Sequence, residues 1–171
     1  MPLDLGTIEQ LYTDIAAAGL ALGLIVVPEF KVQYRKSSGA LAAKTADMVW
    51  VNTPDGQADV TNGEFEVVAI FEIEGFYVPI STISYHSEVY GHIEQWPPSD
   101  PICHVLLYRF ALHRLGNGHH AETVKRCIGD RKMRAAELGS VVQVCDGAER
   151  LWLERARESA TRHLESQAIS P

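Results

Sequence analysis

Apolar side chains recur at helical spacing in four segments of the chain. In the first segment, Ile8, Leu11 and Ile15 fall on one stripe, and Thr7 stands before them as a candidate N-cap. Proline pairs and glycines mark where such stripes stop. The pattern predicts helices over residues 7–22, from Ser81 or Thr82 to about Gln95, over 121–138 and over 148–166.

Other runs alternate or are continuously apolar, and they are rich in β-branched and aromatic residues, which is typical of strands. The first run is interrupted near Pro28, and Ser37-Ser38-Gly39 predicts a turn after it. The predicted strands are residues 25–34, 46–52, 66–74 and 103–112, with a short strand or turn at 141–145. The order of elements predicts an α/β (α+β) fold with a mixed sheet of about four strands.

The length of 171 residues suits one domain with a substantial core, and no boundary of a second domain is visible. No run approaches the ~20 apolar residues that span a bilayer. The N-terminus lacks the basic stretch and cleavage site of a secretory signal. Cys103, Cys127 and Cys145 have no CxxC spacing and are expected to be reduced. These observations predict a cytoplasmic protein with no membrane partner.

Two carboxylates end the apolar run 67–75. Side chains alternate along a strand, so Glu72 and Glu74 lie on one face. The strands 46–52 and 66–74 would most simply pair antiparallel, which brings Asp47 near both glutamates. Placing like charges beside a core is costly unless a cation neutralises them. A hard ion such as Mg²⁺ prefers oxygen ligands and can activate water at a phosphodiester, so this sheet edge is a candidate metal site.

Asp47 on one strand, Glu72-Ile73-Glu74 on the next, and the order helix, three strands, helix, strand resemble the PD-(D/E)XK nuclease superfamily. The resemblance covers roughly residues 5–112 and implies a restriction-endonuclease-like core, with 113–171 as a C-terminal strand and helical extension. It implies Mg (or Mn) held by Asp47, Glu72 and the Ile73 backbone carbonyl. Many members carry a further acid in the first helix, where this chain has Glu9.

The chain departs from the family pattern at Glu74, which stands where most members carry a lysine that positions or activates water. Glu74 itself or a lysine from elsewhere would then orient the attacking water. Lys44, Lys31 and Lys36 are the candidates for that lysine, Lys44 first.

The net charge of −7 argues against indiscriminate binding to polyanions but leaves a local basic patch free to meet phosphate. The resemblance implies DNA as substrate. Cutting both strands favours a homodimer, with Leu151, Trp152 and Leu164 as candidate interface residues. The candidate nucleic-acid contacts are Arg109, Lys125, Arg126, Arg131 and Lys132.

Two alternatives stay open at this point. The chain can be a catalytically inactive nuclease-fold protein that acts as a binding, regulatory or assembly module through a protein partner. The acids can also merely protect a sheet edge from strand-to-strand aggregation. The histidines, including His86 and His92, show no zinc-binding spacing, and no zinc site is expected from them.

Overall fold

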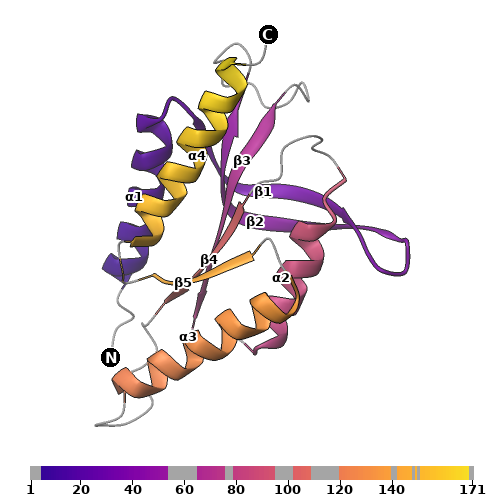
Figure 1. Ribbon diagram of the computed structural model, residues 1–171, viewed down its shortest axis with the longest axis vertical. Helices are drawn as coiled ribbons and strands as arrows, with labels where there is room; N and C mark the ends of the chain where they lie inside the picture. The colour runs from indigo at the N-terminus through magenta and orange to yellow at the C-terminus, as the bar shows by residue number, and fades with distance from the viewer. Residues whose placement is uncertain are drawn as a thin grey trace.

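The computed structural model describes residues 5–53, 65–75, 79–94, 102–108, 120–139, 142–147, 149 and 151–169 (Figure 1). Its helices are α1 (Leu5–Ala21), α2 (Ser81–Gly91), α3 (His120–Glu137) and α4 (Leu151–Ile169). Its strands are β1 (Ile25–Arg35), β2 (Leu41–Asn52), β3 (Glu66–Gly75), β4 (Ile102–Tyr108) and β5 (Val142–Asp146). The mixed α/β class predicted from the sequence is confirmed.

The strands form one mixed sheet in the order β1-β2-β3-β4-β5. The first three strands are antiparallel, and β3, β4 and β5 are parallel. The expected number of about four strands is therefore too low for the described residues. The fifth is β5, which pairs with β4 and buries Val142 and Val144 against the sheet's core. The C-terminal extension thus adds a strand to the sheet.

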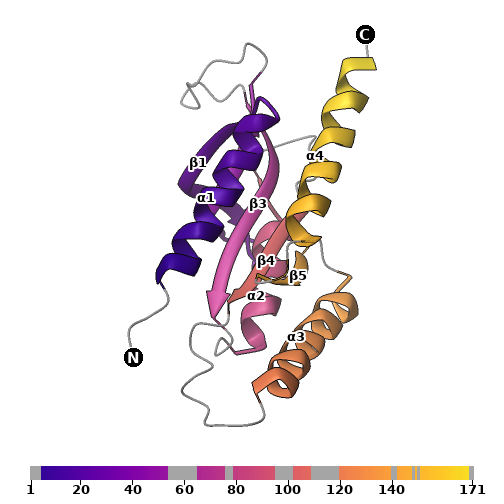
Figure 2. The same cartoon turned by 90° about the vertical axis from the view of Figure 1, so that its left-hand side faces the viewer.

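Helices cover both faces of the sheet, α1 and α4 on one face and α2 and α3 on the other (Figure 2). Each face has its own hydrophobic core. One cluster joins Ile83 of α2 and Ile128 of α3 to the sheet, and the other joins Ile15 of α1 and Ala156 of α4 to it. Among the described helices, none has the length and apolar character needed to cross a membrane.

Trp50 of β2 fixes the position of α1. Its buried indole Nε1 donates a hydrogen bond to the Ile15 carbonyl oxygen at 3.0 Å. Gly19, one turn further along α1, lies so close that a Cβ atom there would be 2.5 Å from that Nε1. The approach of helix to strand therefore depends on the missing side chain of Gly19.

Several predicted boundaries were wrong. β2 begins at Leu41 rather than at residue 46, because the turn at 36–40 closes a long hairpin through a bond from the Lys36 N–H to the Ala40 carbonyl oxygen. Helix α1 begins at Leu5, before the predicted cap. Helix α2 ends at Gly91, and its N-cap residue is Ile80, without a side-chain capping bond.

The outer edge of β1 is irregular at one end and covered at the other. Glu29 takes a positive φ of 50° next to Pro28, where the sequence predicted an interruption. Farther along, the segment after α2 pairs with β1: the Arg35 N–H donates to the His92 carbonyl, and the Glu94 N–H donates to the Gln33 carbonyl. An ion pair from Arg35 to Glu94, 2.7 Å long, reinforces this contact.

Candidate metal centre

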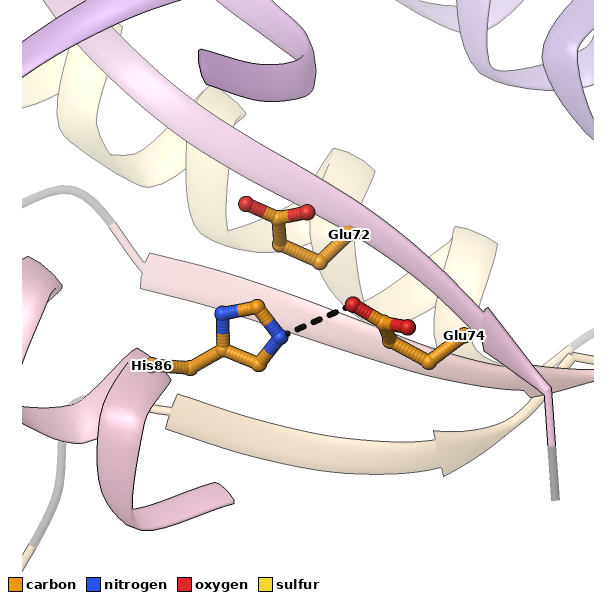
Figure 3. A group of neighbouring side chains, drawn as sticks. All are labelled: Glu72, Glu74 and His86. Atoms are coloured by element: carbon orange, nitrogen blue, oxygen red, sulfur yellow. Dashed lines mark hydrogen bonds and ion pairs between the residues drawn. The ribbon is translucent and has the colours of Figure 1, made fainter. Parts of the chain in front are cut away.

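Glu72 and Glu74 of β3 and His86 of α2 converge at one place beside the sheet (Figure 3). Ligand atoms of the three side chains all lie within 4.8 Å of one another. Glu72 and His86 are each 1% exposed, and Glu74 is half-buried. A group of two carboxylates and an imidazole with this spacing could hold a metal ion.

Local sequence explains why these side chains meet. Strand alternation places both glutamates on the face of β3 that α2 covers. On α2, His86 lies on the same buried stripe as Ile83 and Tyr90, three residues after the first and four before the second. The helix therefore presents an imidazole and a phenol to the strand that carries the acids.

The imidazole of His86 is partnered at one nitrogen. Nε2 lies 3.1 Å from Oε1 of Glu74 (Figure 3). Nδ1 is buried and has no hydrogen-bond partner among the described residues. The ring also stacks on Tyr90, with 6.0 Å between centroids and 20° between planes. The ring is thus held in place while one polar atom is left unsatisfied.

Glu72 is bound by a cation and a phenol. The ammonium of Lys44, on β2, lies 2.6 Å from Oε1 of Glu72, and the Tyr90 hydroxyl donates to the same oxygen. Burial raises the pKa of Glu72, while His86, Lys44 and Tyr90 act in the opposite direction. Burial and the charge of Glu72 raise the pKa of Tyr90, so the phenol remains a donor. Both donors approach the same carboxylate oxygen, Oε1.

Asp47 meets β3 between the two glutamates. The ladder between β2 and β3 runs to the pair Met48–Phe71, and just beyond it the Ile73 N–H donates to Oδ2 of Asp47 at 2.8 Å. The expected antiparallel pairing of these strands is confirmed. Within the described residues, however, the group of mutually close ligand atoms does not include Asp47. Metal binding by Asp47 and by the Ile73 carbonyl stays a prediction.

Helix α1 brings Tyr12 toward the acids, whereas Glu9 is exposed. Burial raises the pKa of Tyr12, and the nearby charges of Asp47 and Glu72 raise it further. Glu9 does not belong to the three-residue group, and its proposed role as a metal ligand stays a prediction. Of the candidate lysines, Lys44 contacts Glu72, and Lys31 and Lys36 are exposed.

The predicted nucleic-acid contacts are mostly on α3. Lys125, Arg126 and Lys132 are exposed, whereas Arg131 is only 9% exposed and donates to the Cys127 carbonyl oxygen of its own helix. Arg131 is therefore poorly placed to meet phosphate. Arg109 lies outside the described residues.

The expected dimer contacts on α4 also differ in exposure. Trp152 is only 2% exposed, packs edge-on against Phe71 and donates to the Gly147 carbonyl oxygen, so it belongs to the protein's own core rather than to a surface that a second copy could contact. Leu151 is 50% exposed and Leu164 half-buried. The homodimer itself stays a prediction.

Sequence reasoning missed His86, Tyr90 and Tyr12. The spacing of the histidines relative to one another carries no information about their distance from the acids of β3. A useful signal was present: His86 and Tyr90 are four residues apart in the helix that directly follows the acidic strand.

Comparison of the chain with models of protein families, with curated proteins and with solved structures gives no match.

Proposed function

We propose that this protein is a metal-dependent nuclease that hydrolyses DNA phosphodiester bonds. The observation that carries the proposal is the Lys44 ammonium, 2.6 Å from Glu72, beside a group of side chains that could hold a metal ion. An acid–lysine pair next to a bound cation suits phosphodiester hydrolysis, in which negative charge develops on phosphate oxygens.

The arrangement of elements supports the resemblance to the PD-(D/E)XK superfamily. Helix α1, the antiparallel strands β1 to β3, helix α2 and strand β4 follow in the order that the resemblance implies. The acids lie on the second and third strands, and Lys44 on β2 supplies a lysine that the motif itself lacks. The proposal therefore includes a restriction-endonuclease-like core.

The charges of the site suit a divalent cation. Asp47, Glu72 and Glu74 carry three negative charges when ionised and Lys44 one positive charge, which leaves −2 (−3 + 1). The donor set fits a metal ion held by Glu72 and Glu74. Such an ion, Mg²⁺ or Mn²⁺, supplies a water of lowered pKa and stabilises charge on the phosphate.

The protein's own side chains have distinct tasks in this proposal. Lys44 fixes Oε1 of Glu72 and offers positive charge to a phosphate oxygen. Tyr90 keeps the Glu72 carboxylate in one orientation through its hydroxyl. Glu74 accepts a hydrogen bond from the attacking water or from His86, and Asp47 holds the β3 backbone at Ile73.

The test is conversion of supercoiled plasmid to nicked circles in the presence of Mg²⁺ or Mn²⁺. We expect the wild type to nick, Glu72→Gln to be inactive, and Lys44→Met to lose on the order of 10²- to 10³-fold, as when one electrostatic donor is removed from an active site. Glu137→Gln, on an exposed glutamate of α3 far along the chain from the site, serves as the matched control and should nick like the wild type.

The second candidate is a binding module that keeps the fold without the chemistry. It is favoured by Glu74, which occupies the position of the motif lysine and is bound to His86. A wild type that nicks no DNA with either ion, together with saturable Mn²⁺ binding in calorimetry, would support this candidate. Absence of both nicking and binding would mean that the acids only protect the sheet.

A further inference from the structure

We propose that His86 is a metal ligand and that the site selects a first-row transition-metal dication (Mn²⁺, Co²⁺ or Zn²⁺) over Mg²⁺. The inference rests on the proposed function, because it concerns the ion of the same site. It changes the expected chemistry of that site, since the superfamily resemblance implies oxygen ligands alone.

The first argument is the environment of His86. Its side chain is 1% exposed, and its Nδ1 has no hydrogen-bond partner among the described residues. The ring is held between Tyr90 and Glu74, and Nε2 is the nitrogen that faces the acid.

The second argument is distance. Nε2 of His86 and Oε1 of Glu74 are 3.1 Å apart. Two neighbouring ligands, each ~2.1 Å from one ion and at right angles, are separated by roughly 3 Å. The same 3.1 Å also suits a hydrogen bond, so an ion can replace the proton between these two atoms without a large movement of either side chain. Figure 3 shows Glu72 beside this pair. Ligand atoms of all three side chains lie within 4.8 Å of one another.

The third argument is how Glu72 is held. Lys44 and Tyr90 both donate to Oε1, so neither of them occupies Oε2. Carboxylate ligands are commonly fixed in this way by neighbouring donors, which orient them and tune their affinity. Glu72 is therefore held in one orientation by hydrogen bonds, as carboxylate ligands of metal ions commonly are.

The choice of ion follows from the donor set. Mg²⁺ demands oxygen ligands and retains much of its water, whereas imidazole binds the later divalent ions of the first transition row well. Affinity for a site with a nitrogen donor should rise from Mn²⁺ to Co²⁺ and remain high at Zn²⁺. A site of two carboxylates and one imidazole should therefore prefer these transition-metal ions to Mg²⁺. Glu72 and Glu74 without His86 would not give that preference.

The experiment is calorimetric titration of the full chain with Mg²⁺, Mn²⁺, Co²⁺ and Zn²⁺, each alone. The wild type should bind Co²⁺ and Zn²⁺ more tightly than Mg²⁺. The variant His86→Gln replaces the nitrogen donor with an oxygen donor. Its affinity for Co²⁺ and Zn²⁺ should fall by more than about tenfold, because loss of a residue that only hydrogen-bonds to a metal ligand already lowers metal affinity about 10- to 100-fold. Affinity for Mg²⁺ should change little. His92→Gln, on an exposed histidine after the same helix, is the control.

A second measurement does not depend on the folding of the variant. Pulsed electron paramagnetic resonance of the wild type loaded with Mn²⁺ should show coupling to a histidine nitrogen. Absence of that coupling, or wild-type Co²⁺ and Zn²⁺ affinity in His86→Gln, would overturn the inference while plasmid nicking could still stand. Nitrogen coupling without any nicking would leave the inference intact and remove the proposed function.

Discussion

Glu72 is a carboxylate almost wholly removed from solvent, with donors from two elements on one of its oxygens. Lys44 of β2 and Tyr90 of α2 approach Oε1, and the side chain of Lys44 is itself only 14% exposed. A buried charge without its partner is costly, whereas the complete pair is close to neutral for stability. The residue-level energetics of the site therefore depend on keeping both partners.

Lys44→Met should lower the free energy of unfolding at pH 7 by about 2 to 4 kcal/mol, because it leaves Glu72 charged without a cation. The loss should shrink as the pH falls through the raised pKa of Glu72, where protonation removes the uncompensated charge. Urea denaturation at several pH values measures both effects.

The double variant Lys44→Met with Glu72→Gln separates charge from packing. It should recover most of the stability lost in the single variant, because no buried charge remains. A double variant as unstable as Lys44→Met alone would mean that the lysine acts through its aliphatic contacts.

At the scale of elements, α1 is attached to the sheet by a close approach rather than by a broad side-chain interface alone. Gly19 admits the Trp50 indole, and a Cβ there would also lie 2.8 Å from Val26 of β1. Gly129 of α3 offers a direct comparison, because a Cβ there meets nothing within 4 Å. The two helical glycines differ only in what surrounds them.

Gly19→Ala should destabilise the protein by about 1 to 3 kcal/mol, since overpacking against a rigid indole outweighs the better helix propensity of alanine. Gly129→Ala should instead stabilise it by about 0.5 to 1 kcal/mol. Thermal or urea unfolding of the two variants gives both signs. Stabilisation in both would show that α1 can shift away from Trp50.

The order of elements was predictable because each signal is local. Strand alternation placed Glu72 and Glu74 on one face, and because the two strands are neighbours in the sequence, an antiparallel pair that brings Asp47 to the glutamates was the simplest choice. The position of His86 over β3 was not predictable in this way, because it depends on how α2 crosses the sheet. The strand β5 was ambiguous because a run of only five residues, four of them apolar, suits either a turn or a strand, and only its pairing with β4 decides.

At the scale of the whole molecule, one buried histidine of the sheet stacks on an aromatic cluster that extends to α4. His104 of β4 is 1% exposed, stacks on Phe71 at 5.2 Å, and has no hydrogen-bond partner at either ring nitrogen among the described residues. Phe71 in turn contacts Trp50 and Trp152. Burial lowers the pKa of His104 to about 4 from 6.5.

The unfolded chain therefore takes up a proton at His104 near pH 6.5, and the folded chain only near pH 4. Stability from this residue is complete above pH 6.5 and is lost as the pH falls from there to about 4, by on the order of 3 kcal/mol. In His104→Phe, which keeps an aromatic ring on Phe71, this part of the decline should vanish. Chemical denaturation between pH 4 and 7 measures it.

His92→Gln provides the control for this slope, since His92 is exposed and should leave the decline unchanged. An equally steep decline in His104→Phe would assign the acid sensitivity of the protein to other groups.

The backbone pairing of residues 92–94 with β1 has a consequence for association between molecules. An uncovered outer strand is a template on which a second chain can continue the sheet. Here the amide of Arg35 and the carbonyl of Gln33 are already engaged from within the same molecule. A second molecule could pair with β1 along this stretch only after residues 92–94 of the first molecule had been displaced from it.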